Sequence, residues 1–341
     1  MALKKVRVSE AVGMVLGHDI TKIVPGEYKG PAFKKGHIVS PEDIPHLLNI
    51  GKDHIYLLEL GEGQVHENDA AQRIACLVGG ENTCFAGPTE GKVNILAKHD
   101  GLLKINRDAV IRINSVEYTV LSTLHGNRLV KAREILAGVK VVPLIVDAET
   151  IEKVERIAGK YHDIVSVKPL QSLKTAVITT GNEVYYGRIQ DKFGPVLAEK
   201  IKTYNATFSG LSFQPDDKEK ITQNILDCIH AGAAVIVVTG GMSVDPDDVT
   251  PDAIRATGAE IITYGTPVLP GAMFMLAYLN NVAILGLPAC GMFAKITVFD
   301  LVFPRILAGE KLSKQDFAEM GYGGLCMNCK ECVYPCCPFG K

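Results

Sequence analysis

The sequence predicts an α/β protein: a three-layer αβα domain with a mostly parallel sheet, preceded by a mixed α+β region. Apolar, β-branched runs such as residues 233–239 have the composition of strands that are buried on both faces. In the second half of the chain these runs alternate with segments of helical periodicity, which is typical of parallel sheets covered by helices. The 341 residues, 47% hydrophobic and 22% charged, suffice for two or three domains with ordinary cores.

Residues 1–170 are predicted to mix short helices with many short strands, as one region or as two subdomains. Ser40-Pro41 marks a helix start, because Ser40 can cap a helix and Pro41 suits the first helical position. The helices predicted here are 40–51, 66–77 and 149–158. The strands predicted here are 55–60, 92–95, 110–113, 118–121 and 139–146. We find no catalytic constellation in this region.

Residues 171–312 are predicted to form the αβα domain. Its strands are expected at 175–180, 207–213, 233–239, 260–264, 274–279 and 282–287. Its helices are expected at 195–205, 218–231, 251–256 and 293–307, the last of which contains Pro304. Ligands of such folds bind at the carboxyl ends of the strands. The turns that follow the strands 175–180 and 233–239 are therefore where chemistry is expected.

Charge and hydropathy narrow the functional classes. Lys plus Arg number 36 and Asp plus Glu number 38, a formal net charge of -2, so nucleic acid is not an expected partner. The apolar stretch after Glu10 is too short for a secretory core. Residues 261–294 contain no Asp, Glu, Lys or Arg, but Pro267, Pro270, Pro288 and several glycines divide them into lengths that suit buried strands. We expect a soluble, cytoplasmic protein without membrane contact.

Two predicted strands end in glycine-rich turns, Thr179–Glu183 and Thr239–Ser243. Glycine allows a sharp turn and a close approach to a ligand, so consecutive amides can converge on an anion. The hydroxyls of Thr180 and Ser243 would add further donors. For either turn alone, the glycines are explained by the reversal of the chain, without any ligand. Two such turns in one αβ unit, each followed by acidic residues, indicate a phosphate site.

Glu183 and Asp191 follow the first turn, and Asp245, Asp247 and Asp248 follow the second. Carboxylates beside a phosphate are expected where a hard divalent cation such as Mg²⁺ screens the repulsion. The residues from Asp248 to Pro251 are also typical of a helix start with a threonine cap. The two roles are compatible, and neither identifies a substrate.

The stretch from about Lys174 to Gly309 resembles the molybdopterin-binding domain shared by molybdopterin adenylyltransferases and molybdopterin molybdenumtransferases. No single motif is specific, but five short motifs occur in the order and spacing of that family. They are Thr180-Gly181-Asn182-Glu183 with the following Gly187 and Asp191, Gly240-Gly241-Met242-Ser243, Asp248-Val249-Thr250-Pro251, Pro270-Gly271, and Gly286-Leu287-Pro288.

The resemblance implies an αβα fold, a bound molybdopterin with its dithiolene and phosphate, and dependence on Mg²⁺. It implies that the catalytic residues are Glu183, Asp191 and Asp248, which would hold Mg²⁺ and orient molybdate or a nucleotide. The cofactor-binding residues that it implies are Thr180, Gly181, Asn182, Gly240, Gly241, Ser243, Thr250, Pro270, Gly271 and Pro288. The amides of Gly181 and of Gly240-Gly241 would hold the phosphate, and catalysis would depend on positioning and charge neutralisation.

The chain also departs from the family. Molybdenumtransferases carry lysines around their Pro-Gly element, whereas residues 266–271 contain none, and their Gly-Leu-Pro-Gly-Asn-Pro is here Gly-Leu-Pro-Ala-Cys-Gly over residues 286–291. The lack of these cations beside an anionic ligand argues against molybdate insertion more than it argues against pterin binding. Two functions therefore stay open: a transferase of molybdenum cofactor biosynthesis, by insertion or adenylylation, and a non-catalytic carrier or sensor of the cofactor. The family further implies a homo-oligomer and a molybdoenzyme apoprotein as a partner.

Residues 321–341 are a cysteine-rich tail. Without an export signal, clustered cysteines more often bind metal than form disulfides. The spacing Cys326-x2-Cys329-x2-Cys332-x3-Cys336, followed by Cys337-Pro338, matches the bacterial ferredoxin run. No second run is present, however, and four thiolates can also surround one zinc ion. We predict a metal site of Cys326, Cys329, Cys332 and Cys336 that holds zinc or an iron–sulfur cluster, and a flexible thiol-rich tail is the alternative.

Overall fold

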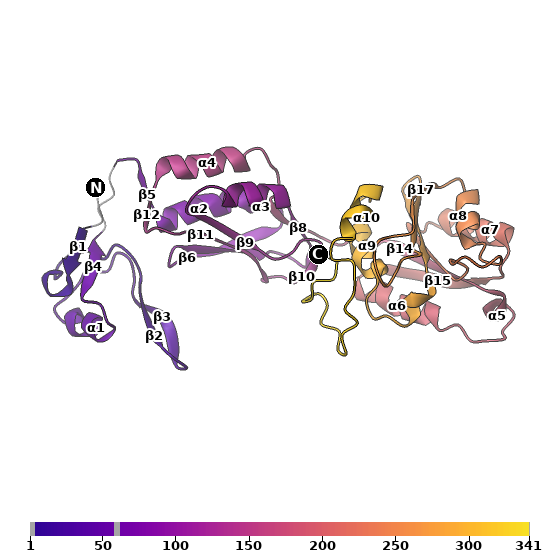
Figure 1. Cartoon of the computed structure of the whole chain (residues 1–341), viewed down its shortest axis with the longest axis horizontal. Coiled ribbons are helices and arrows are strands. Elements are labelled where there is room, and N and C mark those ends of the chain that lie inside the picture. The colour runs from indigo at the N-terminus through magenta and orange to yellow at the C-terminus, as the bar shows by residue number, and fades with distance from the viewer. Residues whose placement is uncertain (1–3, 58–61, 341) are drawn as a thin grey trace. The chain divides into compact units, whose positions relative to one another are not determined.

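The computed structural model describes residues 4–57 and 62–340, and the chain divides into two compact units (Figure 1). The first unit comprises the described part of Met1–His99, with Lys104–Leu124 and Lys131–Val167. The second comprises Asp100–Leu103, His125–Val130 and the described part of Lys168–Lys341.

The first unit is built from short elements. Its strands are β1 (Lys4–Arg7), β2 (Ile20–Val24), β3 (Tyr28–Phe33), β4 (His54–Leu57), β5 (Gln64–His66), β6 (Thr83–Thr89), β7 (Lys92–Ala97), β9 (Thr119–Thr123), β11 (Ile135–Val141) and β12 (Ile145–Asp147). Its helices are η1 (Val8–Glu10), α1 (Asp43–Asn49), α2 (Glu67–Val78), α3 (Arg107–Asn114) and α4 (Ala148–Ala158). Strands β8 (Gly101–Ile105) and β13 (Val165–Lys168) each contain residues of both units.

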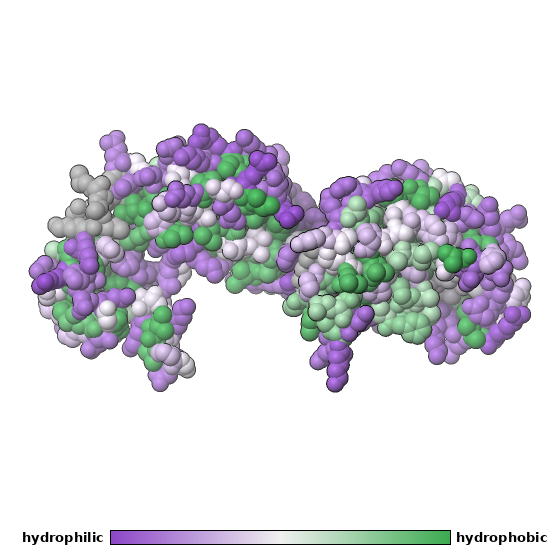
Figure 2. All heavy atoms as spheres, in the orientation of Figure 1, coloured by the Kyte–Doolittle hydropathy of each residue, from purple (hydrophilic) through white to green (hydrophobic). Residues whose placement is uncertain are grey.

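A four-stranded antiparallel sheet, in the order β6-β7-β11-β9, lies against helix α2. Every second residue of β7 is buried, as expected for a sheet with one covered face. Helix α4 packs on α2 and buries Ile151 and Val154, three residues apart on one helical face. Its opposite face is polar, and Figure 2 shows this face in purple.

The beginning of the first unit has a separate small core. Strand β1 pairs with β4 and strand β2 with β3, both antiparallel. Val8, Leu16 and Leu47 are completely buried together there.

The second unit carries the αβα architecture. Its strands are β10 (Leu129–Val130), β14 (Lys174–Thr180), β15 (Thr207–Gln214), β16 (Val235–Thr239), β17 (Glu260–Tyr264), β18 (Met275–Leu279) and β19 (Val282–Leu287). Its helices are α5 (Asn182–Tyr185), α6 (Phe193–Thr203), α7 (Lys218–His230), α8 (Thr250–Ala256), η2 (Ala289–Met292), α9 (Val298–Leu307) and α10 (Lys314–Met320).

A six-stranded sheet runs through the second unit in the order β15-β14-β16-β19-β18-β17. Strands β15, β14, β16 and β19 are parallel, whereas β18 and β17 pair antiparallel at one edge. The side chains of the central strand β16 are buried on both faces, which is why its sequence is continuously apolar. The predicted fold class, a mostly parallel sheet between helices, is therefore confirmed.

Separate apolar cores cover the two faces of this sheet. Val235 and Val237 belong to the core that contains residues of helices α6 and α9. Ile236 and Val238 belong to the core that contains residues of helices α7 and α8. This alternation follows from the two-residue period of a strand.

The C-terminal segment packs against this same unit. The amide of Cys326 donates to the carbonyl oxygen of Leu269, and the amide of Leu269 donates to that of Gly324, both at 2.8 Å. Phe339 is 3% exposed and belongs to the core that includes α9. The cysteine-rich residues are therefore fixed on the αβα unit at both ends of the segment.

Three of the predicted elements are wrong in type or extent. Residues 110–113 were expected to be a strand but belong to helix α3, because the side chain of Asn106 caps the helix by accepting from the amide of Ala109. The expected strand 139–146 is interrupted, since Pro143 lacks an amide and separates β11 from β12. The closing helix begins at Val298, where Thr297 and Asp300 form a capping box, and not at residue 293.

The predicted strand at 55–60 is described only as far as Leu57, where β4 ends, and its remaining residues lie outside the described residues. The uncharged stretch 261–294 contains strands β18 and β19 with their turns. In the part of the chain that the structure describes, no helix has both the length and the apolar character needed to cross a bilayer.

We predict that Asp300→Ala destabilises the second unit strongly. The Asp300 carboxylate is 2% exposed and accepts from the Lys200 ammonium at 2.6 Å and from the Tyr204 hydroxyl at 2.9 Å. Its removal leaves both donors without this acceptor in a buried place, so the free energy of unfolding should fall by about 3–5 kcal/mol. Urea unfolding followed by circular dichroism measures it.

The matched control is Asp252→Ala, which removes a solvent-exposed ion pair with Arg255 and should cost at most about 1 kcal/mol. Equal losses in the two variants would contradict the prediction.

Candidate functional site

The carboxyl ends of three parallel strands lie in register at one edge of the sheet. Thr179 of β14 pairs with Thr239 of β16, and Thr239 pairs with Leu287 of β19. The chain then leaves each strand through one of the predicted motifs. We call these three exits, residues 180–183, 240–243 and 288–291, the rim. The two glycine turns therefore lie at the same edge of the sheet, as the sequence predicted.

The first turn is hydrogen-bonded to residues at and just after the end of strand β15. Gly181 has φ 138°, a backbone conformation that side chains rarely allow, and its amide donates to the carbonyl oxygen of Gln214 at 3.1 Å. The amide of Asn182 donates to the Asp216 carboxylate at 2.9 Å. The amides of Gly181 and Asn182 are thus already used, so the expected role of the Gly181 amide in holding a phosphate is not supported.

The second turn is different. Gly240 and Gly241 have φ values of 89° and 54°. Within the described residues, the amides of Gly240, Gly241, Met242 and Ser243 donate to no protein acceptor. The turn is held instead by its carbonyl groups: the Gly241 oxygen accepts from the Thr250 amide at 3.2 Å, and the Met242 oxygen accepts from the Tyr264 hydroxyl at 3.1 Å. Consecutive amides without partners are the feature of an anion-binding nest.

Thr180 connects the two turns. Its hydroxyl is buried and donates to the carbonyl oxygen of Thr239 at 3.1 Å. Because this donation uses its one proton, the Thr250 hydroxyl, also at 3.1 Å, is the donor in the second contact. A Cβ on Gly240 would lie 2.3 Å from the Thr180 carbonyl oxygen. Glycine is therefore required at residue 240 by packing as well as by φ.

The carboxylates around the rim repel one another. Asp216 follows strand β15, and its burial raises the pKa of its carboxyl group above the ordinary value, with the charges of Glu183, Asp247 and Asp248 acting in the same direction. The hydrogen bond from the Asn182 amide opposes this shift. Glu183 is exposed and Asp248 is half-buried. Glu183 and Asp248, expected from the sequence, are thus close enough to interact electrostatically with a common neighbour.

Asp191 is used differently. Its carboxylate accepts from the amides of Phe193 at 2.8 Å and Gly194 at 3.1 Å, at the start of helix α6, and from the Thr179 hydroxyl at 3.3 Å. These contacts are those of a helix cap. Its predicted role at a magnesium ion stays a prediction.

The third exit meets the Pro-Gly element. Gly271, Pro288 and Cys290 line a cavity of about 10 Å³, together with Val298 at the start of α9. Gly271 has φ 134°, and a Cβ there would lie 2.6 Å from a methyl carbon of Val298. Gly271 and Pro288, expected from the sequence to contact the cofactor, are therefore brought to one place, and Pro270 precedes Gly271 in the chain. Burial raises the pKa of the Cys290 thiol.

Sequence reasoning missed Asp216 and Tyr264. Asp216 lies two residues after the end of β15, which neighbours β14, so its position at the same sheet edge could have been inferred from the parallel pairing. Tyr264 ends an edge strand and carries no motif that would mark it.

The cysteine-rich segment lies around a second, larger cavity of about 470 Å³. Cys326, Cys329 and Cys332 line it as expected, but exposed Cys336 does not, and Cys337 lines it instead. Across residues 4–57 and 62–340, no group of three or more His, Cys, Asp or Glu side chains already converges closely enough to hold a metal ion.

Residues 176–308 match the family model described as "Probable molybdopterin binding domain". The αβα domain belongs to the molybdopterin-binding domain family. Residues 5–59 match a second family model, described as "Domain of unknown function (DUF8806)". The first of these models matches the domain that contains the rim. The model that matches residues 5–59 assigns no function to them.

Two relatives resemble the chain over different lengths. A molybdopterin molybdenumtransferase of Haemophilus influenzae is 24% identical over 299 residues, which cover 82% of this chain and 70% of that protein. A molybdenum cofactor biosynthesis bifunctional protein of Synechococcus elongatus is 30% identical over 97 residues, which cover 28% of this chain and only 30% of that protein.

Among solved structures, the chain is similar to the tungsten cofactor synthesizing protein MoaB from Pyrococcus furiosus. The two share 20% sequence identity with a TM-score of 0.34, over 40% of this chain and 96% of that one.

We predict that Asp216→Asn stabilises the protein at pH 7. The raised pKa means that the folded chain holds this proton more tightly than the unfolded chain does. The tighter protonation of Asp216 therefore stabilises the folded chain fully below the ordinary pKa of 3.8. This stabilisation is lost as the pH rises through the pKa of Asp216 in the folded chain. Asparagine keeps an oxygen for the Asn182 amide and carries no charge, so the urea midpoint should exceed that of the wild type at pH 7.

Asp217→Asn is the control with the opposite sign. The Asp217 carboxylate accepts from the amides of Glu219 and Lys220 at the start of α7, and the Lys220 amide is the main cause that lowers its pKa. This variant should unfold at a lower urea concentration at pH 7. Destabilisation by Asp216→Asn at pH 7 would contradict the conclusion that burial and the neighbouring carboxylates disfavour the charged form of Asp216.

Proposed function

We propose that the αβα domain binds molybdopterin at the rim and that the chain is a magnesium-dependent transferase that inserts molybdate into the pterin. The observation that carries this proposal is the run of amides at Gly240–Ser243, for which the described residues provide no acceptor, at the same sheet edge as a group of carboxylates that raise the pKa of Asp216. The amides suit a phosphate and the carboxylates suit a hard cation.

The phosphate of molybdopterin would lie on the second turn. The amides of Gly240–Ser243, which have no acceptor within the described residues, would donate to its oxygen atoms. The exposed Ser243 can add a hydroxyl. Thr180 and Thr250 stabilise the turn from beneath, since their hydroxyls bond to each other. Asn182, Pro270, Gly271 and Pro288 would form the remaining walls for the pterin.

Mg²⁺ fits the carboxylates at the rim. It is usually held by one or two carboxylates together with substrate phosphates, so the proposal does not require three protein ligands, and within the described residues no such group is found. When bound, it would neutralise the charge of molybdate and phosphate. Glu183 and Asp248 are the ligands that we propose, with Asp216 beside them, and Asp191 would act by positioning helix α6.

Insertion is preferred over adenylylation because of the extent of the similarity. The alignment with the molybdenumtransferase runs over 82% of this chain, well beyond the αβα domain. An oligomer and transfer of the product to a molybdoenzyme would accompany this function.

A non-catalytic cofactor carrier is the second candidate. Residues 266–271 and 286–291 contain no Lys or Arg, so the pterin side of the rim provides little positive charge for molybdate. A carrier needs the amides of the second turn but does not need the carboxylates.

The test is cofactor formation from molybdopterin, molybdate and Mg²⁺, measured by the activity that a molybdenum-free molybdoenzyme regains. Glu183→Gln should lower the rate by about 10–100-fold and raise the Mg²⁺ concentration needed, because an exposed ligand is lost without effect on folding. Asp252→Asn, exposed on α8, should leave the rate unchanged.

Molybdopterin affinity, measured separately by titration, distinguishes the candidates. Tight binding without turnover in the wild type would overturn the transferase and favour the carrier. No binding at all would overturn both.

A further inference from the structure

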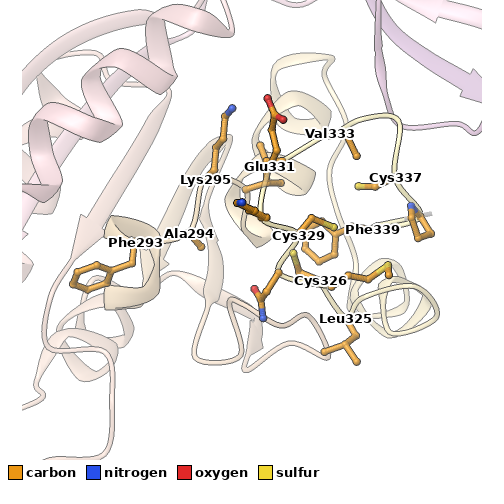
Figure 3. A pocket seen from close by; sticks show the side chains of 16 residues that line it. Phe293, Ala294, Lys295, Leu325, Cys326, Cys329, Glu331, Val333, Cys337 and Phe339 are labelled. Atoms are coloured by element: carbon orange, nitrogen blue, oxygen red, sulfur yellow. The ribbon is translucent and has the colours of Figure 1, made fainter.

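The C-terminal segment lies around a cavity that has four cysteines in its lining. The cavity of about 470 Å³ is lined by Cys326, Cys329, Cys332 and Cys337. Figure 3 shows Cys326, Cys329 and Cys337 on this segment around the cavity, and Phe293 at its far edge. Cys336 is exposed and does not line the cavity, although it stands next to Cys337 in the chain.

The segment is held in place by the αβα unit. Cys326 is anchored by the hydrogen bond of its amide to Leu269. At the other end, Phe339 is buried, and a Cβ on Gly340 would lie 2.5 Å from a methyl carbon of Leu301, so this end fits closely against α9. Cys326 and Cys337 pack against the same core. The four cysteines therefore line a cavity formed by a segment that is anchored at both ends.

The spacing of these four residues agrees with cluster binding. Cys326, Cys329 and Cys332 have the two-residue gaps of the bacterial iron–sulfur run. In that run the fourth cysteine is followed by proline, and here the cysteine that precedes proline is Cys337, not Cys336. The x3 spacing of the run selects Cys336, whereas the following proline selects Cys337. The structure favours Cys337, because of these two residues it is the one that lines the cavity.

The size of the space favours a cluster over a single ion. In a zinc site four ligands close to about 2.3 Å around one ion. Among the described residues no three of these thiols converge in that way, and the four cysteines instead line a cavity of about 470 Å³. Lys295 and Lys330 also line the cavity and can offset the negative charge of a thiolate-bound cluster, whereas Glu331 adds to it.

We propose that Cys326, Cys329, Cys332 and Cys337 bind one [4Fe–4S] cluster in this cavity and that Cys336 is not a ligand. Each thiol loses its proton on binding iron. The bound cluster would cross-link residues 326–337 of the C-terminal segment and raise the thermal midpoint of the second unit. Neither statement requires molybdopterin to bind.

The test compares Cys337→Ser with its neighbour Cys336→Ser in the full chain. Each protein is purified without oxygen, supplied with iron salts and sulfide, desalted, and analysed for iron, acid-labile sulfide and visible absorption. Wild type and Cys336→Ser should each hold about four iron and four sulfide per chain. Cys337→Ser should lose most of both, with its circular dichroism unchanged. If Cys337→Ser fails to fold, Cys332→Ser serves as the second variant, and it should also lose most of its iron and sulfide.

Three outcomes would overturn the proposal. The first is loss of the cluster in Cys336→Ser with retention in Cys337→Ser. The second is a wild type that binds one zinc ion tightly, when zinc alone is supplied, and takes up no sulfide. The third is a wild type that retains no metal. None of these outcomes bears on pterin binding, so failure here and failure of the proposed function are distinguishable.

Discussion

The parallel register of β14, β16 and β19 is the constraint on which the rest of the site depends. Thr179, Thr239 and Leu287 stand side by side, so three turns distant in sequence leave the sheet at one edge. The edge then divides into parts with different chemistry. In the first turn the amides of Gly181 and Asn182 donate to Gln214 and Asp216, whereas in the part of the chain that the structure describes the amides of Gly240–Ser243 donate to no protein acceptor. The proposed phosphate and Mg²⁺ sites are assigned to these two parts of the edge.

Much of the fold could be predicted from local patterns. Strands such as β16 are continuously apolar because both faces are buried, and the helices between them show a clear period. The errors fell where tertiary or capping contacts override composition. Residues 110–113 have the β-branched content of a strand, yet a capping asparagine and burial of Ala109 and Ile113 make them helical.

The candidate site was less predictable than the fold. Position along the chain marked Glu183, Asp248 and the glycine turns, because all of them follow strands of one sheet. It could not show that the Gly181 amide and the Asp191 carboxylate are occupied by Gln214 and by helix α6, since those partners are set by packing. For the same reason the spacing suggested Cys336, while the folded segment turns Cys337 toward the cavity.

Phosphate binding by the amides of the second turn is the central claim, and the amide resonances of ¹⁵N-labelled protein test it most directly during titration with molybdopterin. We predict that the resonances of Gly240 and Gly241 move most, while that of Gly258, a glycine of similar φ at an open turn, stays in place. Binding that leaves residues 240–243 unchanged and shifts another segment would contradict the claim.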